Sequence, residues 1–304
     1  ASLRAGDALT AIAKPDDASV DAWDDQLLLT LRSPWTIGDR TWPAGALLAI
    51  PLADFLAGKR DFAMLYEPRP STSLDSVATT KTAIIVTELE DVKSRIYVHR
   101  RGAQGWSRTA MAVPDVGALG VSAYDEDTSD DFWFTETGFT TPTTLSLGTV
   151  GTAARTKLKA SPAYFDAKDV VATQHFATSA DGTKVPYFQV ARRDLPLDGS
   201  TPTVLTGYGG FEISLTPGYD ATGGAAWLER GGALVTANIR GGGEYGPAWH
   251  QAALTHHRQR AYDDFAAVAE DLIARKVTST PHLGIVGGSN GGLLMGVMLT
   301  QRPE

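Results

Sequence analysis

The sequence predicts two parts of different fold class. Residues 1–158 are expected to form part of an all-β propeller, its C-terminal blades, and residues 159–304 the N-terminal part of an α/β domain with a mostly parallel sheet and flanking helices. Three observations predict this. Apolar segments recur in the first half at a spacing typical of propeller blades. Strands and helices alternate in the second half, and a glycine-rich turn joins its last strand to its last helix.

Three similar segments in the first half each begin a strand, a polar loop and a second strand. They are Leu27-Leu28-Leu29-Thr30, Ile84-Ile85-Val86-Thr87 and Phe132-Trp133-Phe134-Thr135, the last two offset by 48 residues. A four-stranded blade needs this length, and it must stack on neighbouring blades to bury both faces. A β-sandwich with a chance repeat is the alternative. Because closed propellers have about four to eight blades, we expect the chain to begin inside the propeller.

The second half begins with a predicted hairpin, because Asp181-Gly182 suits a tight turn between two apolar segments. Strands and helices then alternate, which favours a sheet with helices on its faces. The expected strands are 170–177, 185–191, 203–206, 233–239 and 283–286, with a short helix at 225–230 and a long helix between the last two strands.

The long helix is identified by one apolar stripe, formed by Phe265, Val268, Ala269, Leu272 and Ile273. The same helix carries four acidic residues. We interpret them as a solvated face that favours the helix dipole, rather than as general acids or metal ligands. These residues are Asp263, Asp264, Glu270 and Asp271.

Composition excludes several classes of function. The net charge of −8 opposes binding to nucleic acid or to anionic membranes, and no apolar run is long enough to span a bilayer. The chain has no cysteine, which excludes disulfides and thiolate chemistry and fits the cytoplasm and the periplasm equally. No cluster of histidines and carboxylates has a metal-ligand spacing, so we expect no metal and no cofactor.

The segment from Gly287 to Gly292 reads Gly-Gly-Ser-Asn-Gly-Gly and matches the G-x-S-x-G motif between an apolar strand and a helix. This motif predicts a sharp, strained turn that exposes the Ser289 hydroxyl, with only small residues tolerated at Gly287 and Gly291. The Asn290 N–H would lie at a helix N-terminus, directed at developing negative charge. The pattern favours an α/β-hydrolase domain with Ser289 as nucleophile. A plain glycine-rich turn or a phosphate-binding loop is the alternative, and the latter lacks the lysine it needs.

A second glycine cluster, from Gly207 to Phe211, follows an earlier strand. Hydrolases of this fold carry their other oxyanion donor at this place, and the Tyr208 hydroxyl is a candidate for it. Taken alone, the cluster is equally consistent with a Tyr208 that only packs or forms part of a turn.

Together these motifs resemble the prolyl oligopeptidase family of serine peptidases, densely over about residues 181–304. The first half is similar to later blades of that family's propeller, mainly in pattern. The resemblance rests on Asp181-Gly182-Thr183-Lys184-Val185-Pro186, Gly207-Tyr208-Gly209-Gly210-Phe211, Ala237-Asn238-Ile239-Arg240-Gly241-Gly242-Gly243-Glu244-Tyr245-Gly246, Trp249-His250, Tyr262-Asp263-Asp264-Phe265, Gly287-Gly288-Ser289-Asn290-Gly291-Gly292 and Gln301-Arg302-Pro303.

The resemblance implies hydrolysis of short peptides, often after proline, with the propeller keeping folded proteins from the site. It makes Ser289 the nucleophile, the Tyr208 hydroxyl and the Asn290 N–H the oxyanion hole, and Phe211 a wall of the substrate pocket. Arg240 and Glu244 are expected to hold loop structure rather than to contact substrate.

One departure from the family is large. The triad order in this fold is Ser, then Asp or Glu, then His, yet the 15 residues after Ser289 contain no Asp and no His. We therefore expect the chain to be part of a longer protein, whose C-terminal part supplies the base and its orienting acid, and to be inactive alone. Two alternatives stay open: a dipeptidyl-peptidase, acylaminoacyl-peptidase or esterase of the same fold, and a non-catalytic propeller-containing fragment that binds peptides.

Overall fold

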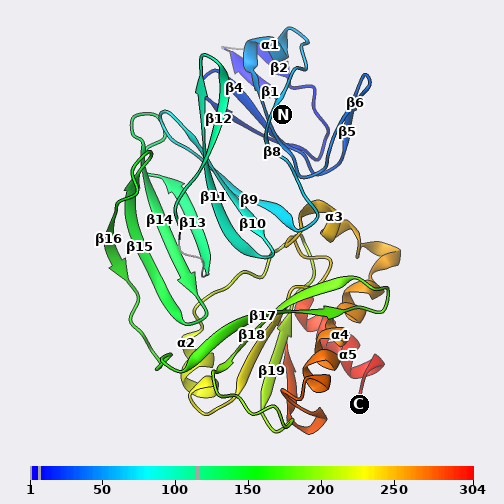
Figure 1. Cartoon of the computed structure of the whole chain (residues 1–304). Helices are drawn as coiled ribbons and strands as arrows, with labels where there is room; N and C mark the ends of the chain where they lie inside the picture. Colours follow the sequence, from blue (N-terminus) through cyan, green and yellow to red (C-terminus); the bar gives the residue numbers. More distant parts are fainter. Residues whose placement is uncertain (1, 6–7, 114–116) are drawn as a thin grey trace.

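The structure is a computed structural model that describes residues 2–5, 8–113 and 117–304. Figure 1 shows antiparallel sheets fanned above an α/β part, which holds the C-terminus. No helix within these ranges has the length and the apolar composition needed to cross a bilayer.

Over its described residues, the first half contains three antiparallel sheets of four strands each, in which the strand order follows the order along the chain. Two small hairpins and one short helix accompany them. The sheets are β3 (Ser19–Trp23), β4 (Gln26–Thr30), β7 (Leu47–Pro51) and β8 (Ala63–Tyr66); β9 (Thr72–Thr79), β10 (Ile84–Glu90), β11 (Lys93–Gly102) and β12 (Gly105–Ala110); and β13 (Ala118–Ala123), β14 (Asp131–Gly138), β15 (Thr141–Thr149) and β16 (Arg155–Ala160). The hairpins are β1 (Ser2–Ala5) with β2 (Ala8–Ala11) and β5 (Trp35–Ile37) with β6 (Arg40–Trp42), and the helix is α1 (Leu52–Leu56).

The three recurring segments are the second strands of the three sheets, β4, β10 and β14. Each blade begins with a strand that the repeat did not reveal, namely β3, β9 or β13. The first two segments lie further apart than the last two because the β5–β6 hairpin is inserted between β4 and β7, and α1 between β7 and β8.

The sheets pack face to face, which confirms the predicted propeller and excludes the sandwich. On β4, Leu27 and Leu29 face the core of their own blade, whereas Leu28 packs in a cluster with Ile84 of the next blade. Ile85 then packs with Phe132 and Phe134 of the third blade. Both faces of β4 and β10 are therefore buried, whereas β14 buries chiefly the face that carries Phe132 and Phe134. The three blades do not form a closed ring.

The second half forms a five-stranded mixed sheet in the order β17-β18-β20-β19-β21. Strand β18 is antiparallel to both of its neighbours, β17 and β20, whereas β20, β19 and β21 are parallel to one another. The strands are β17 (Val170–Thr178), β18 (Lys184–Arg192), β19 (Thr203–Gly207), β20 (Ala233–Ala237) and β21 (Leu283–Val286). The helices are α2 (Ala221–Gly223) with the π-helical turn η1 (Gly224–Leu228), α3 (Gly246–Gln251), α4 (Gln259–Ala274) and α5 (Asn290–Gln301), with single 3-10 turns η2 (Thr255–His257) and η3 (Thr280–His282).

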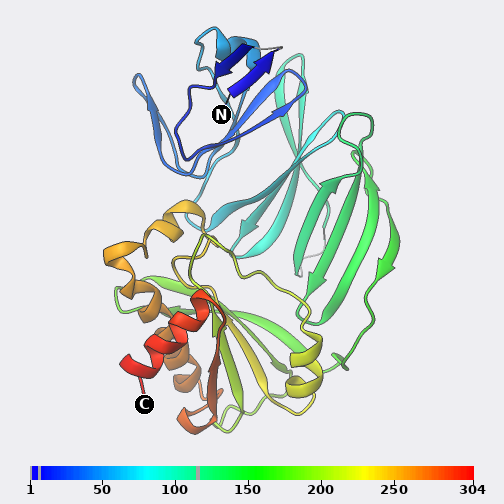
Figure 2. The same cartoon turned by 180° about the vertical axis from the view of Figure 1, so that it is seen from behind.

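Helices α4 and α5 cover one face of this sheet, as seen from behind in Figure 2. The predicted stripe supplies much of that core: Phe265, Val268 and Leu272 are fully buried, while Ile273 is 38% exposed. The turn η1 covers the opposite face, where Leu228 packs with Val190. This helical segment begins earlier than predicted, because Asp220 accepts a hydrogen bond from the Gly223 N–H and caps it.

The predicted division of the chain at 158/159 lies within β16, and the connection between the two parts runs from 161 to 169. The placement of the domain boundary stays a prediction.

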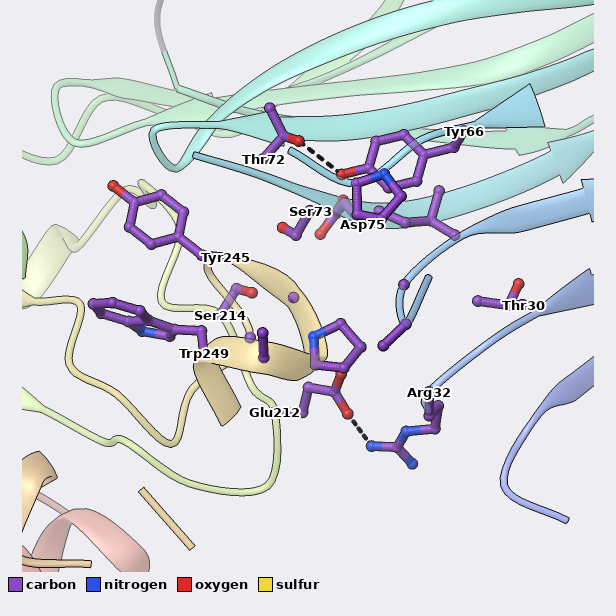
Figure 3. Close-up of a pocket in the computed structure, with 18 of the residues that line it drawn as sticks. Thr30, Arg32, Tyr66, Thr72, Ser73, Asp75, Glu212, Ser214, Tyr245 and Trp249 are labelled. Atoms are coloured by element: carbon purple, nitrogen blue, oxygen red, sulfur yellow. Dashed lines mark hydrogen bonds and ion pairs between the residues drawn. The ribbon is translucent and has the colours of Figure 1, made fainter. Parts of the chain in front are cut away.

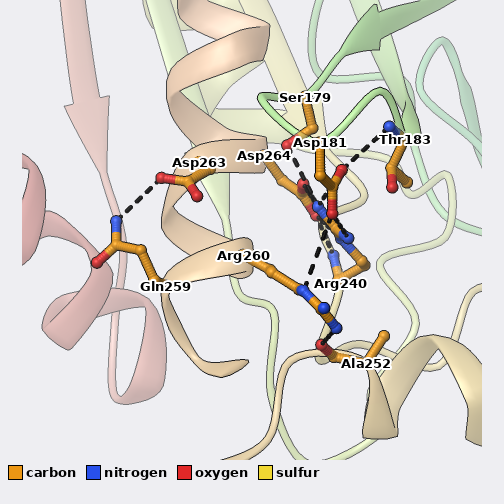
Figure 4. A network of polar contacts seen from close by, with 9 residues as sticks. All are labelled: Ser179, Asp181, Thr183, Arg240, Ala252, Gln259, Arg260, Asp263 and Asp264. Atoms are coloured by element: carbon orange, nitrogen blue, oxygen red, sulfur yellow. Dashed lines mark hydrogen bonds and ion pairs between the residues drawn. The ribbon is translucent and has the colours of Figure 1, made fainter. Parts of the chain in front are cut away.

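The interpretation of the acidic helix residues as a solvated face is wrong for Asp264, which is fully buried. Arg240, in the loop after β20, donates to both Asp264 oxygens, at 2.6 and 2.9 Å (Figure 4). It also binds Asp181 in the β17–β18 turn, and this contact holds the pKa of Asp181 below its usual range. The ion pair was missed because its partners come from separate elements. Glu270, by contrast, is exposed and pairs with Arg302.

We predict that Asp264→Ala destabilises the protein by about 3 to 5 kcal/mol, because it leaves the buried Arg240 guanidinium with the half-exposed Asp181 as its one acidic partner within the described residues. The matched change Asp263→Ala removes a surface contact to Gln259 and should cost less than about 0.5 kcal/mol. Chemical unfolding of the two variants measures the difference. Equal effects of the two substitutions would contradict a structural role for the pair.

Candidate active site

Ser289 occupies the turn between β21 and α5, with its side chain exposed. Its backbone has φ 53° and ψ −119°, a region that residues with a Cβ rarely adopt. Structure on both sides of Ser289 maintains this strained backbone. Before it, β21 is paired to β19; after it, the Ser289 carbonyl oxygen accepts from the Gly292 N–H at 2.9 Å in the first turn of α5.

The glycines beside Ser289 are needed for space, as predicted. A Cβ at Gly287 would lie 2.6 Å from the Gly291 carbonyl oxygen. A Cβ at Gly291 would lie 2.8 Å from the Gly207 carbonyl oxygen, in the other glycine-rich loop. Any side chain at either position would push the strand, the helix or the second loop away.

The Gly207–Phe211 loop lies against this turn. The Asn290 side chain donates from Nδ2 to the Tyr208 carbonyl oxygen at 2.5 Å, and Arg258 binds both the Asn290 Oδ1 and the Gly209 carbonyl oxygen. The Tyr208 ring is half-buried, and its Cδ2 lies 3.8 Å from the position of a Cβ on residue 291. The two glycine-rich segments therefore form one site.

Three polar groups in this site have no hydrogen-bond partner within the described ranges: the Ser289 hydroxyl, the Tyr208 hydroxyl and the Asn290 backbone N–H. The N–H is at the first residue of α5, where the helix dipole also favours negative charge. A nucleophilic hydroxyl and two free donors are the groups needed to stabilise a tetrahedral oxyanion, and these roles for Ser289, Tyr208 and Asn290 stay a prediction.

Phe211 lies next to Tyr208, with 6.5 Å between the ring centroids, and is 72% exposed. Its backbone also has a positive φ of 55°, as does that of Glu212 at 58°. Phe211 lines a cavity of 870 Å³ between the propeller sheets and the α/β part. Phe211 is a wall of that cavity, whereas its contact with substrate stays a prediction.

The two parts of the chain are joined around this cavity (Figure 3). Arg32, which follows β4, forms an ion pair with Glu212 beside Phe211. Ser73 of β9 donates to the Glu244 carbonyl oxygen at 3.0 Å, and the Tyr245 hydroxyl donates to Asp91 at 2.9 Å. The position of the propeller is thus coupled to the loops that carry the site.

The histidines of the chain, all within the described ranges, make no hydrogen bond to Ser289. The His250 Nδ1 contacts the Gly241 carbonyl oxygen at 2.7 Å and the Glu212 backbone nitrogen at 3.1 Å, and His282 contacts Ser279. His175 contacts Thr173 and Arg275, and His99 is buried in the second blade. His256 and His257 lie on the exposed turn η2. No group of three or more potential metal ligands occurs within the described ranges.

Glu244 binds Leu215, which lies in the loop that continues from Tyr208. The sequence predicts only that Glu244 holds loop structure. Its Oε1 accepts from the Leu215 N–H at 3.0 Å, while Asn238 donates to the Leu215 carbonyl oxygen at 2.8 Å. The two side chains thus fix both polar groups of one residue. Burial raises the pKa of Glu244 to about 7, against the lowering effect of these donors.

Sequence reasoning missed the part of Arg258 and of the Asn290 side chain in joining the two loops. No motif surrounds Arg258 that would have revealed it. The motif at 287–292 did include Asn290, but it drew attention to the backbone N–H rather than to the side-chain amide.

Sequence models of known families match most of the chain. The model described as "Prolyl oligopeptidase, N-terminal beta-propeller domain" matches residues 4–161, and the one described as "Prolyl oligopeptidase family" matches residues 220–304. The chain belongs to the prolyl oligopeptidase family. It is 47% identical to an uncharacterized peptidase of Sinorhizobium fredii over 282 residues, which is 92% of this chain and 39% of that protein.

Two further proteins that this chain resembles have names that state an activity. It is 33% identical to a prolyl endopeptidase of Elizabethkingia miricola, covering 79% of this chain and 35% of that protein. The solved structure of a post-proline cleaving enzyme from Rickettsia typhi superposes with a TM-score of 0.88 at 33% identity, covering 98% of this chain and 43% of that one. The chain thus spans about two fifths of the length of these relatives.

We predict a pH-dependent effect of Glu244→Gln on stability. The pKa of the Glu244 carboxyl is about 7 in the folded protein and 4.5 in the unfolded chain, so the unfolded chain loses this proton at a lower pH. The free energy of unfolding therefore falls as the pH rises from about 4.5 to 7. The glutamine variant does not titrate and keeps the acceptor for Leu215. Its stability relative to the parent protein should therefore rise by up to about 3 kcal/mol between roughly pH 5 and pH 8.

Chemical unfolding of both proteins at the two pH values measures this change. A stability difference that is the same at both would show that the Glu244 carboxyl does not retain its proton on folding.

Proposed function

We propose that the full-length protein is a serine peptidase that hydrolyses short peptides through an acyl-enzyme, with Ser289 as nucleophile. The observation that carries this proposal is the strained, exposed Ser289, whose free hydroxyl lies at the joined loops that also carry two unpartnered donors. The names of the relatives, a prolyl endopeptidase and a post-proline cleaving enzyme, support peptides as the substrate class.

The chemistry follows from the donors. Ser289 Oγ attacks the carbonyl carbon of the scissile bond, and the carbonyl oxygen takes up negative charge. The Asn290 N–H and the Tyr208 hydroxyl donate to this oxygen, and the charge-assisted hydrogen bonds are stronger than those to the neutral carbonyl. The C–N bond then breaks as the amine takes up the proton that the serine gave to the base, and water releases the acyl group in a second step with the same geometry.

The serine proton needs an acceptor. Since no histidine within the described ranges reaches Ser289, we assign the general base, and the acid that orients it, to the remaining part of the protein. The chain alone is then expected to lack turnover, because a serine hydroxyl without its base is a poor nucleophile.

Proline specificity is the finer part of the proposal. It rests on the names of the relatives and on Phe211 as an apolar, exposed wall near Tyr208. A dipeptidyl-peptidase, an acylaminoacyl-peptidase and an esterase would use the same Ser289 chemistry, so they differ from a post-proline enzyme only in substrate preference.

We predict that a fluorophosphonate probe labels the full-length protein and that Ser289→Ala abolishes the labelling. The probe reacts only with an activated serine, so the measurement is the covalent adduct by mass spectrometry. Equal labelling of both proteins would refute Ser289 as nucleophile and favour a non-catalytic, peptide-binding module.

We predict that Tyr208→Phe lowers kcat by about 100- to 1,000-fold, with a small change in KM, because one oxyanion donor is lost while the ring stays. Tyr124→Phe, on an exposed propeller residue, is the matched control and should retain full activity. An active Tyr208→Phe variant would remove Tyr208 from the oxyanion hole.

We predict that peptides with proline before the scissile bond are cleaved at least about tenfold faster than proline-free peptides of the same length, in terms of kcat/KM. A smaller ratio, together with rapid cleavage of N-terminal dipeptides, acylated residues or esters, would assign the protein to one of the other three activities.

A further inference from the structure

The second blade of the propeller contains a β-bulge beside the interdomain cavity. Thr87 of β10 pairs with Ser76 of β9, and the next residue, Glu88, pairs with Leu74. Asp75 is therefore the extra residue of β9 and has no partner across the ladder. Bulges are frequent next to functional sites because they redirect one side chain without breaking the sheet.

Asp75 is one of the residues that line the 870 Å³ cavity (Figure 3). The same cavity is lined from the α/β part by Phe211 and Tyr245, so it extends from the loop that carries Tyr208 to the second blade. The Asp75 side chain is exposed to the cavity, yet the protein around it is dense enough that desolvation raises its pKa. Asp75 thus faces the cavity as one of its lining residues.

The other charged groups of the cavity wall are paired. Arg32 forms its ion pair with Glu212, and Arg69 lies 3.5 Å from Glu88. The Asp75 carboxylate, by contrast, has no ion-pair or hydrogen-bond partner in the described part of the chain, and no donor lowers its pKa. Within this part of the chain, Asp75 is thus the charged side chain of the cavity wall that has no partner, while Arg69 shares Glu88 with Arg108, which binds it at 2.7 Å.

We propose that Asp75 binds a positively charged group of the peptide substrate, an α-amine or a Lys or Arg side chain, inside the interdomain cavity. It is thereby a specificity-determining residue for cationic peptides. This inference rests on the proposed peptidase function and deepens it.

Two physical arguments favour a cation as the ligand. A carboxylate that has lost part of its hydration is stabilised by a cationic partner more than an exposed one is, because the surrounding protein weakens screening. In addition, no cation of the cavity wall competes for Asp75, because Arg32 is bound to Glu212 and Arg69 lies against Glu88. A neutral peptide would gain no such interaction.

The test uses the full-length protein and a set of proline-containing peptides of one length. Each peptide carries a single lysine in place of norleucine, at successive positions on either side of the cleavage site. The ratio of kcat/KM for the lysine and norleucine peptides is measured at each position. Binding of the same peptides to the Ser289→Ala protein is measured by fluorescence anisotropy, which requires no turnover.

We expect one position at which lysine is preferred by about tenfold in both measurements, a factor typical of a hydrogen bond to a charged group. Asp75→Asn keeps the shape of the side chain and should bring this ratio close to one, with cleavage of the norleucine peptides unchanged. Asp127→Asn, an exposed change of the same charge in the third blade, should leave the preference intact.

The absence of a lysine preference at every position, or a preference that survives Asp75→Asn, would overturn the inference. These outcomes are distinct from failure of the proposed function. If neither peptide is cleaved by the parent protein, the peptidase proposal fails, whereas the binding ratio in the Ser289→Ala background still reports on Asp75.

Discussion

The hydrogen bond from the Asn290 side chain to the Tyr208 carbonyl oxygen is the contact on which the site depends. It joins two segments that lie 82 residues apart in the chain, one after β19 and one after β21. The two strands are adjacent and parallel, so their carboxyl ends meet at one edge of the sheet, where α/β folds place their sites. The amide then sets the spacing between Tyr208 and the first turn of α5, with Arg258 binding both sides.

The same loops are held from the propeller. Glu244 binds Leu215 through its carboxyl and Ser73 of the second blade through its carbonyl oxygen, so one residue links the propeller to the loop that carries Tyr208. The Arg32–Glu212 ion pair adds a second link beside Phe211. A shift of the propeller would therefore be transmitted to the walls of the cavity, which gives the propeller a direct physical means of influencing the site.

Local patterns predicted much of this structure. The repeat at 27, 84 and 132 identified the second strand of each blade, because β4 and β10 are buried on both faces and largely apolar, and Phe132 and Phe134 give β14 one buried face. The motif at 287–292 located the strained turn because only one backbone geometry suits it. Contacts between distant elements could not be predicted in this way. Asp264 has the same surroundings in sequence as the surface residue Asp263, and its burial depends on Arg240, 24 residues away. The bulge at Asp75 likewise follows from strand pairing, which the sequence of β9 alone does not specify.

The most direct test of this account is a crystal structure of the full-length protein with a peptidyl phosphonate bound covalently to Ser289. The phosphonate oxygen mimics the oxyanion of the tetrahedral intermediate. The account predicts that this oxygen lies within about 3 Å of both the Asn290 backbone nitrogen and the Tyr208 hydroxyl, with the Asn290 amide still bound to the Tyr208 carbonyl oxygen. An oxygen that points away from both donors, or an adduct on a different residue, would contradict it.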